Sequence, residues 1–195
     1  MSFINVDCAN KSVGDAEYAE ILRTSDLRLG DGIGLRIGGR LVGSEIRQNV
    51  NGTDLFPVLC SRMAECDLRL FLLGGRPGVP EDVAKWIESQ HPRLQVVGTQ
   101  HGYFERSRSM DVCARINASG ADVVLVAFGA PLQEAWIRRH RTQLGARAAL
   151  GVGGLFDFYS GRIPRAPLGV GALMPMRTQS RTSRPERQNG VAMTC

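Results

Sequence analysis

Residues 122–131 read Asp-Val-Val-Leu-Val-Ala-Phe-Gly-Ala-Pro, and this stretch decides the fold class. The run 122–127 is rich in β-branched residues and almost wholly apolar, which is typical of a strand buried on both faces. Gly129 ends the strand, and Pro131 suits the first turn of a helix that we expect to reach about Gln143. A fully apolar strand followed at once by a helix indicates a parallel sheet.

The same alternation of short apolar runs and longer amphipathic segments extends along the chain in both directions. The sequence therefore predicts a single α/β domain, a Rossmann-like parallel sheet with helices on both faces. Further strands are expected at 3–6, 27–29, 68–73, 94–97 (closed by Gly98) and 148–152, and further helices at 16–23, 81–90 and 109–117.

The pattern stops after Pro167. Residues 175–190 are rich in Arg, Ser, Thr, Pro and Gln and show no apolar period, so we predict a domain at 1–167 and a disordered, basic tail at 168–195. The net charge of the chain is +5, and residues 165–187 carry five arginines against one glutamate, a net of +4. A nearly neutral body with 6% aromatic residues disfavours a nucleic-acid-binding module.

The chain carries no run of about 18 apolar residues and no signal-peptide pattern at its N-terminus. Its five cysteines are scattered without metal-type spacing, as is typical of a reducing compartment. We therefore expect a cytoplasmic protein without a membrane span.

Four glycine clusters follow predicted strands, where ligands of open parallel sheets bind. Glycine lets the backbone approach a phosphate closely, and the next helix directs free N–H groups toward it. The clusters predict a crevice for a nucleotide or sugar phosphate, and four ordinary strand-to-helix turns are the alternative. None of them has Walker A or dinucleotide-fingerprint spacing. They lie at 30–34, 74–78, 129–131 and 151–154.

Several polar residues near these loops are candidates for chemistry. Asp31 lies between two glycines, either as a general base or as a helix cap. Arg47 can offset phosphate charge or be a solvated surface group, whereas Asp54 reads more readily as a cap or turn residue. Gln133 and Glu134 open a helix, where they would face the crevice and grip a sugar hydroxyl, although a first-turn glutamate also compensates the helix dipole.

The loop 101–104, His-Gly-Tyr-Phe, presents an imidazole and two aromatic rings, for substrate contact or for packing. Nowhere does the chain contain Asp-x-Asp or a His/Cys/Glu cluster with metal-ligand spacing. The sequence therefore predicts that a diphosphate would be held by arginines and helix N-termini without a metal.

Together, these motifs resemble those of the WecG/TagA/CpsF glycosyltransferases, in order from about Asn5 to Pro167. The resemblance implies an inverting transfer from a UDP-sugar to a sugar on a polyprenyl diphosphate, in the biosynthesis of exopolysaccharides and other cell-envelope polymers. The donor sugars it implies are N-acetylmannosamine, its uronic acid and glucose, with no metal and no cofactor. It also implies work at the inner face of the cell membrane and allows a homo-oligomer. The matching segments are 31–34, Arg47, 51–55, 71–78, 101–104, 129–137, 151–158, Gly161 and 165–167.

The resemblance also assigns residues. Asp31 matches the family's general base, Arg47 an arginine that stabilises the leaving diphosphate, and Gln133 a glutamine of the catalytic set. The positions expected to contact substrate or nucleotide are Asn5, Gly32, Gly34, Asn51, Thr53, Asp54, Gly74, Gly75, His101, Gly129, Pro131, Glu134, Gly153, Gly154 and Asp157.

The chain departs from the family pattern after Pro167. There the family continues with an aromatic, arginine-rich helical segment that reaches the membrane, and this chain has a polar tail instead. The alternative function is therefore a truncated, inactive member that retains only UDP-sugar binding.

Overall fold

A computed structural model describes residues 1–44, 46 and 48–162 of the chain, and β5 (Val123–Ala127) lies at the centre of its sheet with every residue buried. On one side β5 pairs in parallel with β3 (Leu70–Gly74), and on the other with β6 (Ala148–Gly151). The expected strand at 122–127 is therefore confirmed, and its apolar composition follows from its two covered faces.

The complete sheet has six strands in the order β2-β1-β6-β5-β3-β4, and every pairing is parallel. The edge strands are β4 (Val96–Gln100) and β2 (Arg28–Gly30), and β1 (Ser2–Ile4) lies between β2 and β6. β1 meets β6 through one register pair, Ser2 opposite Gly151, whereas β5 pairs with β3 over its whole length. These pairings confirm the predicted Rossmann-like α/β class.

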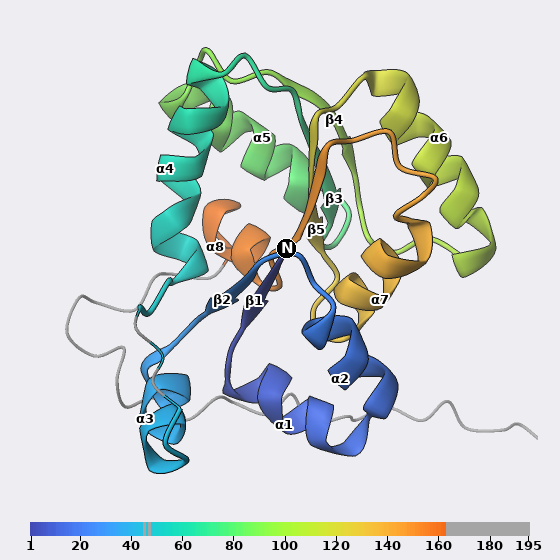
Figure 1. The fold of residues 1–195 in the computed structure, drawn as a ribbon. Coiled ribbons are helices and arrows are strands. Elements are labelled where there is room, and N and C mark those ends of the chain that lie inside the picture. The colour runs from blue at the N-terminus through green and yellow to red at the C-terminus, as the bar shows by residue number, and fades with distance from the viewer. Residues whose placement is uncertain (45, 47, 163–195) are drawn as a thin grey trace, which may run out of the picture. The chain divides into compact units, whose positions relative to one another are not determined.

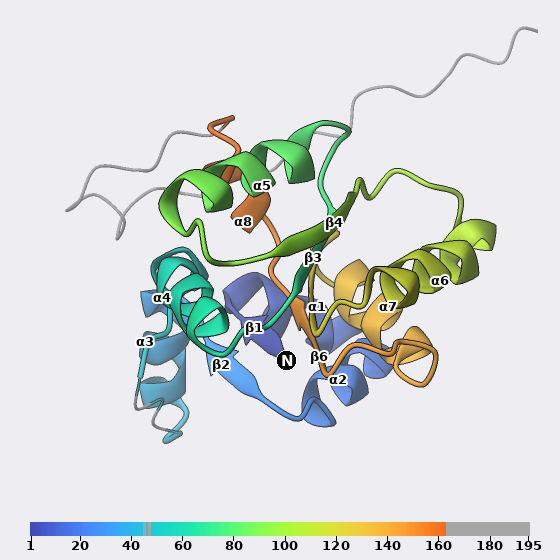
Figure 2. The same ribbon diagram turned by 90° about the horizontal axis from the view of Figure 1, so that it is seen from above.

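Helices cover both faces of the sheet (Figures 1 and 2). Because strand side chains alternate, Leu70 and Leu72 join the core under one layer, while Phe71 and Leu73 join the core under the other. The first layer contains α4 (Gly52–Glu65), α5 (Val79–Gln90) and α8 (Leu155–Tyr159). The second contains α6 (Ser109–Ser119) and α7 (Leu132–His140), with α1 (Val6–Gly14) and α2 (Ala16–Arg23) over β1.

Two predicted strand boundaries were wrong for identifiable reasons, and one short helix was missed. β4 runs through Gly98 to Gln100, because a side chain at Gly98 would lie 2.5 Å from the Phe71 ring: the glycine allows close packing and does not end the strand. The first strand stops at Ile4, because Asn5 caps α1 through a 2.9 Å hydrogen bond from the Cys8 N–H. The short helix α8 had no expected counterpart.

In the described part of the chain, no helix combines the length and apolarity needed to cross a membrane. Residues 163–195 lie outside the described residues, and with them the matched segment 165–167 and the expected tail at 168–195. The division at Pro167 therefore stays a prediction.

Candidate functional site

All six strands end at the same edge of the sheet, because the sheet is entirely parallel. The register sets Ile4 of β1 opposite Gly30 of β2, so Asn5 and Asp31 leave neighbouring strands at the same level. Ligands of such sheets bind at this carboxyl edge. The expected site residues that lie within four positions after a strand here are Asn5, Asp31, Gly32, Gly34, Gly75, His101, Gly129, Pro131, Gly153 and Gly154.

Asp31 follows β2, and its backbone N–H donates to the Ile4 carbonyl at 2.7 Å. The helix that follows, α3 (Ile33–Leu41), has Gly32 as its N-cap and no side-chain cap bond, so the interpretation of Asp31 as a helix cap is wrong. Burial raises the pKa of the Asp31 carboxyl, and the negative charge of Asp54 raises it further, while the Gly52 N–H acts in the opposite direction. A carboxyl group with a raised pKa is suited to take a proton from a hydroxyl.

A loop before α4 closes around Asp31. The Gly32 N–H donates to Asn49 Oδ1 at 2.6 Å, and the Val50 N–H donates to the Gly30 carbonyl at 2.8 Å. The sequence contains no indication of this role for Asn49, because its partner Gly32 lies 17 positions earlier in the chain. Asn51 caps α4 through the Thr53 N–H, and Asp54, expected as a cap or turn residue, lies in the first turn of that helix. Arg47 lies outside the described residues, and its assignment stays a prediction.

Gln133 and Glu134 were expected to face an open crevice, but their side chains are only 3% and 2% exposed. Gln133 Nε2 donates to Glu134 Oε1 at 2.7 Å, and Gln133 Oε1 accepts from the Gly153 N–H at 2.8 Å. The amide lies directly over Gly151, where a Cβ atom would be 2.9 Å from Nε2. Gln133 thus joins the start of α7 to the loop after β6.

Glu134 is the most buried acid of this region. Burial raises its pKa, and the hydrogen bond from Gln133 opposes that effect in part. The positive charge of Lys11 and the hydroxyl of buried Tyr18 oppose the rise as well. Nearby, Lys11 Nζ donates to the Ala130 carbonyl at 2.9 Å and so ties α1 to the loop after β5.

The glycine loops fall into two kinds. At Gly74, φ is +128° and an added Cβ would lie 2.5 Å from the Ala127 carbonyl oxygen, so this glycine is needed for backbone packing between β3 and β5. At Gly153, φ is +56° and nothing lies within 4 Å of the Cβ position. Gly32 and Gly129 also have a positive φ and open space at the Cβ position. The open kind leaves room for a ligand beside the backbone.

Other expected contact residues make local hydrogen bonds. Thr53 donates its hydroxyl to Asn51, and its carbonyl accepts from the Tyr159 hydroxyl at 2.6 Å. His101 Nδ1 accepts from the Tyr103 N–H at 3.2 Å. Asp157 lies in the first turn of α8. These bonds preorganise the loops, and the substrate contacts stay predictions. Within the described ranges, no group of three His, Cys, Asp or Glu residues is placed to hold a metal ion.

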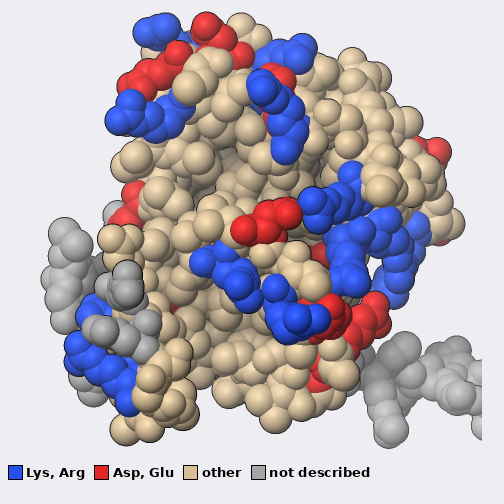
Figure 3. Space-filling model, in the orientation of Figure 1, with Lys and Arg blue, Asp and Glu red and all other residues tan. Residues whose placement is uncertain are grey.

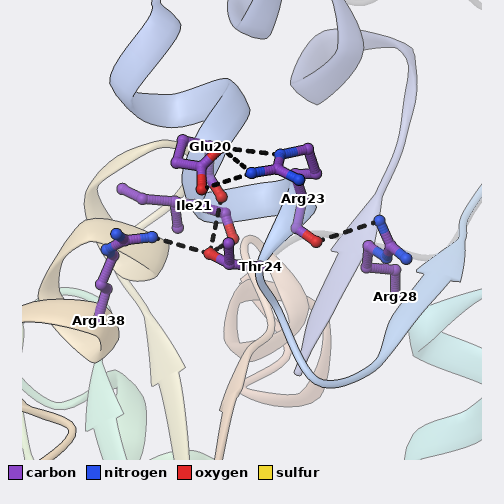
Figure 4. Close-up of polar contacts among 6 residues, drawn as sticks. All are labelled: Glu20, Ile21, Arg23, Thr24, Arg28 and Arg138. Carbon is purple, nitrogen blue, oxygen red and sulfur yellow. Dashed lines mark hydrogen bonds and ion pairs between the residues drawn. The ribbon is translucent and has the colours of Figure 1, made fainter.

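A separate cleft of about 310 Å³ lies between α2 and α7, near the amino end of β1, and Met1, Asp26 and Arg141 line it. Figure 4 shows its rim, where Arg138 Nη1 donates to Thr24 Oγ1 at 2.8 Å. Figure 3 shows Lys and Arg side chains gathered over α7, with acidic side chains beside them. The carboxyl edge is the candidate site, because Asp31 and the open glycine loops lie there and not in this cleft.

Most of the chain is similar to known proteins. Residues 1–174 match the model of the Glycosyl transferase WecG/TagA/CpsF family. The chain is 32% identical over 167 residues to an N-acetylglucosaminyldiphosphoundecaprenol N-acetyl-beta-D-mannosaminyltransferase of Bacillus subtilis (strain 168), covering 86% of this chain and 64% of that protein.

A protein of the same name from Bacillus spizizenii is 31% identical over 163 residues, covering 84% of this chain and 63% of that relative. The chain therefore spans less than two thirds of the length of both relatives. Since the family model covers most of the chain, this protein belongs to the WecG/TagA/CpsF family of glycosyl transferases.

Proposed function

We propose that this protein transfers N-acetylmannosamine from its UDP-activated form to the sugar of a polyprenyl-diphosphate-linked acceptor. The observation that carries the proposal is Asp31, a partly buried carboxyl group with a raised pKa at the carboxyl edge of the sheet. The names of both Bacillus relatives support the sugar and the lipid-linked acceptor. Of the three donors that the sequence suggested, N-acetylmannosamine agrees with those names.

The proposed chemistry is a single displacement at the anomeric carbon. The acceptor hydroxyl attacks from the face opposite UDP, its proton passes to the Asp31 carboxylate, and the bond to the diphosphate oxygen breaks, with inversion. The burial of Asp31 favours its neutral form and so makes it a stronger proton acceptor than a solvated aspartate. The open loops at Gly32, Gly129 and Gly153 leave room for the diphosphate beside the backbone, while the Gly32 and Gly153 N–H groups themselves donate to Asn49 and Gln133.

Gln133 has a positioning role in this proposal. Its amide is buried and holds the Gly153 N–H, so it orders the loop that would face the diphosphate. Arg47, which the family resemblance assigns to the leaving group, is proposed to add positive charge there. No step of the proposal requires a metal.

The test is transfer from a panel of UDP-sugars to a short-chain polyprenyl diphosphate bearing N-acetylglucosamine, with EDTA present. We expect turnover with UDP-N-acetylmannosamine and a loss of at least about 100-fold in kcat for Asp31→Asn. The matched control is Asp111→Asn, an exposed acid on α6, with unchanged kcat.

Near-normal kcat in Asp31→Asn would contradict the base assignment. UDP binding without turnover for any donor would overturn the proposed transfer and support the alternative, a family member that binds UDP-sugar without reacting it.

A further inference from the structure

Helix α3 is unusual among the helices of the described chain, because none of its residues is buried. Its exposed side chains are nonetheless largely apolar: Ile33 is 45% exposed, Ile37 55% and Leu41 82%, and Val42, just past its end, is 78% exposed. Soluble proteins rarely gather several large apolar side chains in one exposed place without a function.

The apolar residues of α3 form one stripe. Ile33, Ile37 and Leu41 are spaced by four, so they lie on the same side of the helix. The other side packs on the domain: the Cβ position of Gly39 lies 3.4 Å from the Ile46 side chain, and that of Gly30 lies 3.5 Å from Leu35. The stripe therefore faces away from the protein.

The charged residues of α3 itself have one sign. Arg36 and Arg40 lie on this helix, which contains no acidic residue, whereas Asp31 and Glu45 bound the segment 32–44 in the sequence. Among the described residues, no ion pair engages either arginine. An apolar stripe flanked by arginines is the pattern of a helix that lies in the interface of an anionic membrane.

The position of α3 fits such a contact. It begins two residues after Asp31, at the carboxyl edge where the acceptor would react. Half-exposed Val6 lies against its first turn, 2.9 Å from the Cβ position of Gly34, and extends the apolar surface toward Asn5. Figure 1 shows α3 beyond the end of β2, outside the helix layers that cover the sheet.

We propose that α3 is a membrane-contacting element of this protein, with Ile33, Ile37, Leu41 and Val42 immersed among the lipids of an anionic bilayer. Arg36 and Arg40 then lie at the level of the phosphate headgroups. This proposal rests on the proposed function, because a lipid-linked acceptor is the reason for a bilayer to lie beside Asp31. The contact brings the acceptor's diphosphate to the site from the plane of the bilayer.

The experiment uses the full chain and vesicles of phosphatidylcholine with or without phosphatidylglycerol. Ile37→Trp places a fluorescent reporter on the stripe, and Leu27→Trp is the matched control, because Leu27 is 49% exposed at the amino edge of the sheet. The fluorescence of each introduced tryptophan is the emission of the variant minus that of the wild type. With brominated lipids, we expect this added emission to be quenched in Ile37→Trp and not in Leu27→Trp. Residues 163–195 are the same in both proteins, so they cannot produce this difference.

Co-sedimentation tests the energetics. Ile37→Ser with Leu41→Ser should lower vesicle partitioning by more than about tenfold. Arg36→Gln and Arg40→Gln should each lower it about fivefold on anionic vesicles and leave neutral vesicles unaffected. Leu27→Ser should match the wild type.

Equal quenching in the two tryptophan variants would overturn the proposal. So would an Ile37→Trp emission shift that follows protein concentration without vesicles, because that result means a second copy covers the stripe. Transfer to a detergent-solubilised short-chain acceptor separates this proposal from the proposed function. Intact transfer without vesicle binding contradicts only the role of α3, and vesicle binding without any transfer contradicts only the enzyme.

Discussion

The side-chain carbonyl of Gln133 accepts a hydrogen bond from the Gly153 N–H at 2.8 Å, across 20 positions of the chain. This bond joins the first turn of α7 to the loop after β6, and the Gln133 amide is held in turn by Glu134. Because Gln133 is 3% exposed, its bonds are protected from water and fix the path of one open glycine loop.

Removal of this amide should affect both stability and catalysis. Gln133→Ala leaves the Gly153 N–H and Glu134 Oε1 without their partner, so we expect a loss of about 1–3 kcal/mol in the free energy of unfolding. The kcat should fall as the loop loses its order. Urea unfolding and the transfer assay measure the two effects. Gln90→Ala, at an exposed end of α5, should change neither. A Gln133→Ala protein with normal kcat would remove the positioning role.

Gly74→Ala should destabilise the fold by about 3 kcal/mol. The added methyl group would lie 2.5 Å from the Ala127 carbonyl oxygen, on backbone that cannot move without parting β3 from β5. The matched control is Gly14→Ala, at the end of α1, where nothing lies within 4 Å of the Cβ position. Thermal unfolding of the two variants measures the difference, and equal midpoints would show that the strands accommodate the methyl group.

The activity should depend on pH through Asp31. Its pKa is raised above the ordinary 3.8, so kcat/KM should fall as the pH drops through a midpoint above that value. The stability of the fold should depend on pH in the opposite direction to the activity. A raised carboxyl pKa means that ionisation destabilises the folded state, so Asp31→Asn should be more stable than the wild type at neutral pH.

The gain from Asp31→Asn should vanish below about pH 3.8, where the carboxyl is protonated in both states. Urea midpoints measured across this pH range check the linkage. A variant that is less stable at neutral pH would mean that Asp31 contributes more to structure than its burial indicates.

Asp122 provides the reverse case at the amino edge of the sheet. The backbone N–H and guanidinium of Arg69 lower the pKa of Asp122, through bonds of 3.0 and 3.1 Å to Oδ2. This stabilisation is present above the ordinary pKa of 3.8 and is lost as the pH falls through the lower, folded-state value. Asp122→Asn should therefore lower the thermal midpoint at pH 7, and the difference should close in acid. A constant difference at all pH values would contradict the electrostatic origin.

The local pattern predicts the sheet well where one strand is apolar throughout. The run 122–127 and the helix at 16–23 agree with β5 and α2 to within one residue, because burial and periodicity act over a few neighbouring positions. At Gly98, the sequence alone does not distinguish a strand end from a close contact with Phe71. That distinction depends on a residue 27 positions earlier.

For the candidate site too, the sequence predicts what depends on neighbouring residues and not what depends on distant ones. The position of Asp31 after a strand follows from the local pattern, but its rise in pKa depends on burial and on Asp54 across the loop. The burial of Gln133 was not predictable, because the space that its side chain fills exists only where Gly151 lacks a side chain.

β1 and β6 share a single register pair, and the residues of the candidate site lie on both sides of it. Asp31 belongs to the small β1–β2 pair, whereas Gln133 and Gly153 belong to the four-strand block around β5. Amide hydrogens of β1 and β2 should accordingly exchange with solvent sooner than those of β3 and β5. The proposed base and the loop proposed to face the diphosphate thus lie on opposite sides of the β1–β6 pairing, so the relative placement of these two strands fixes the distance between them.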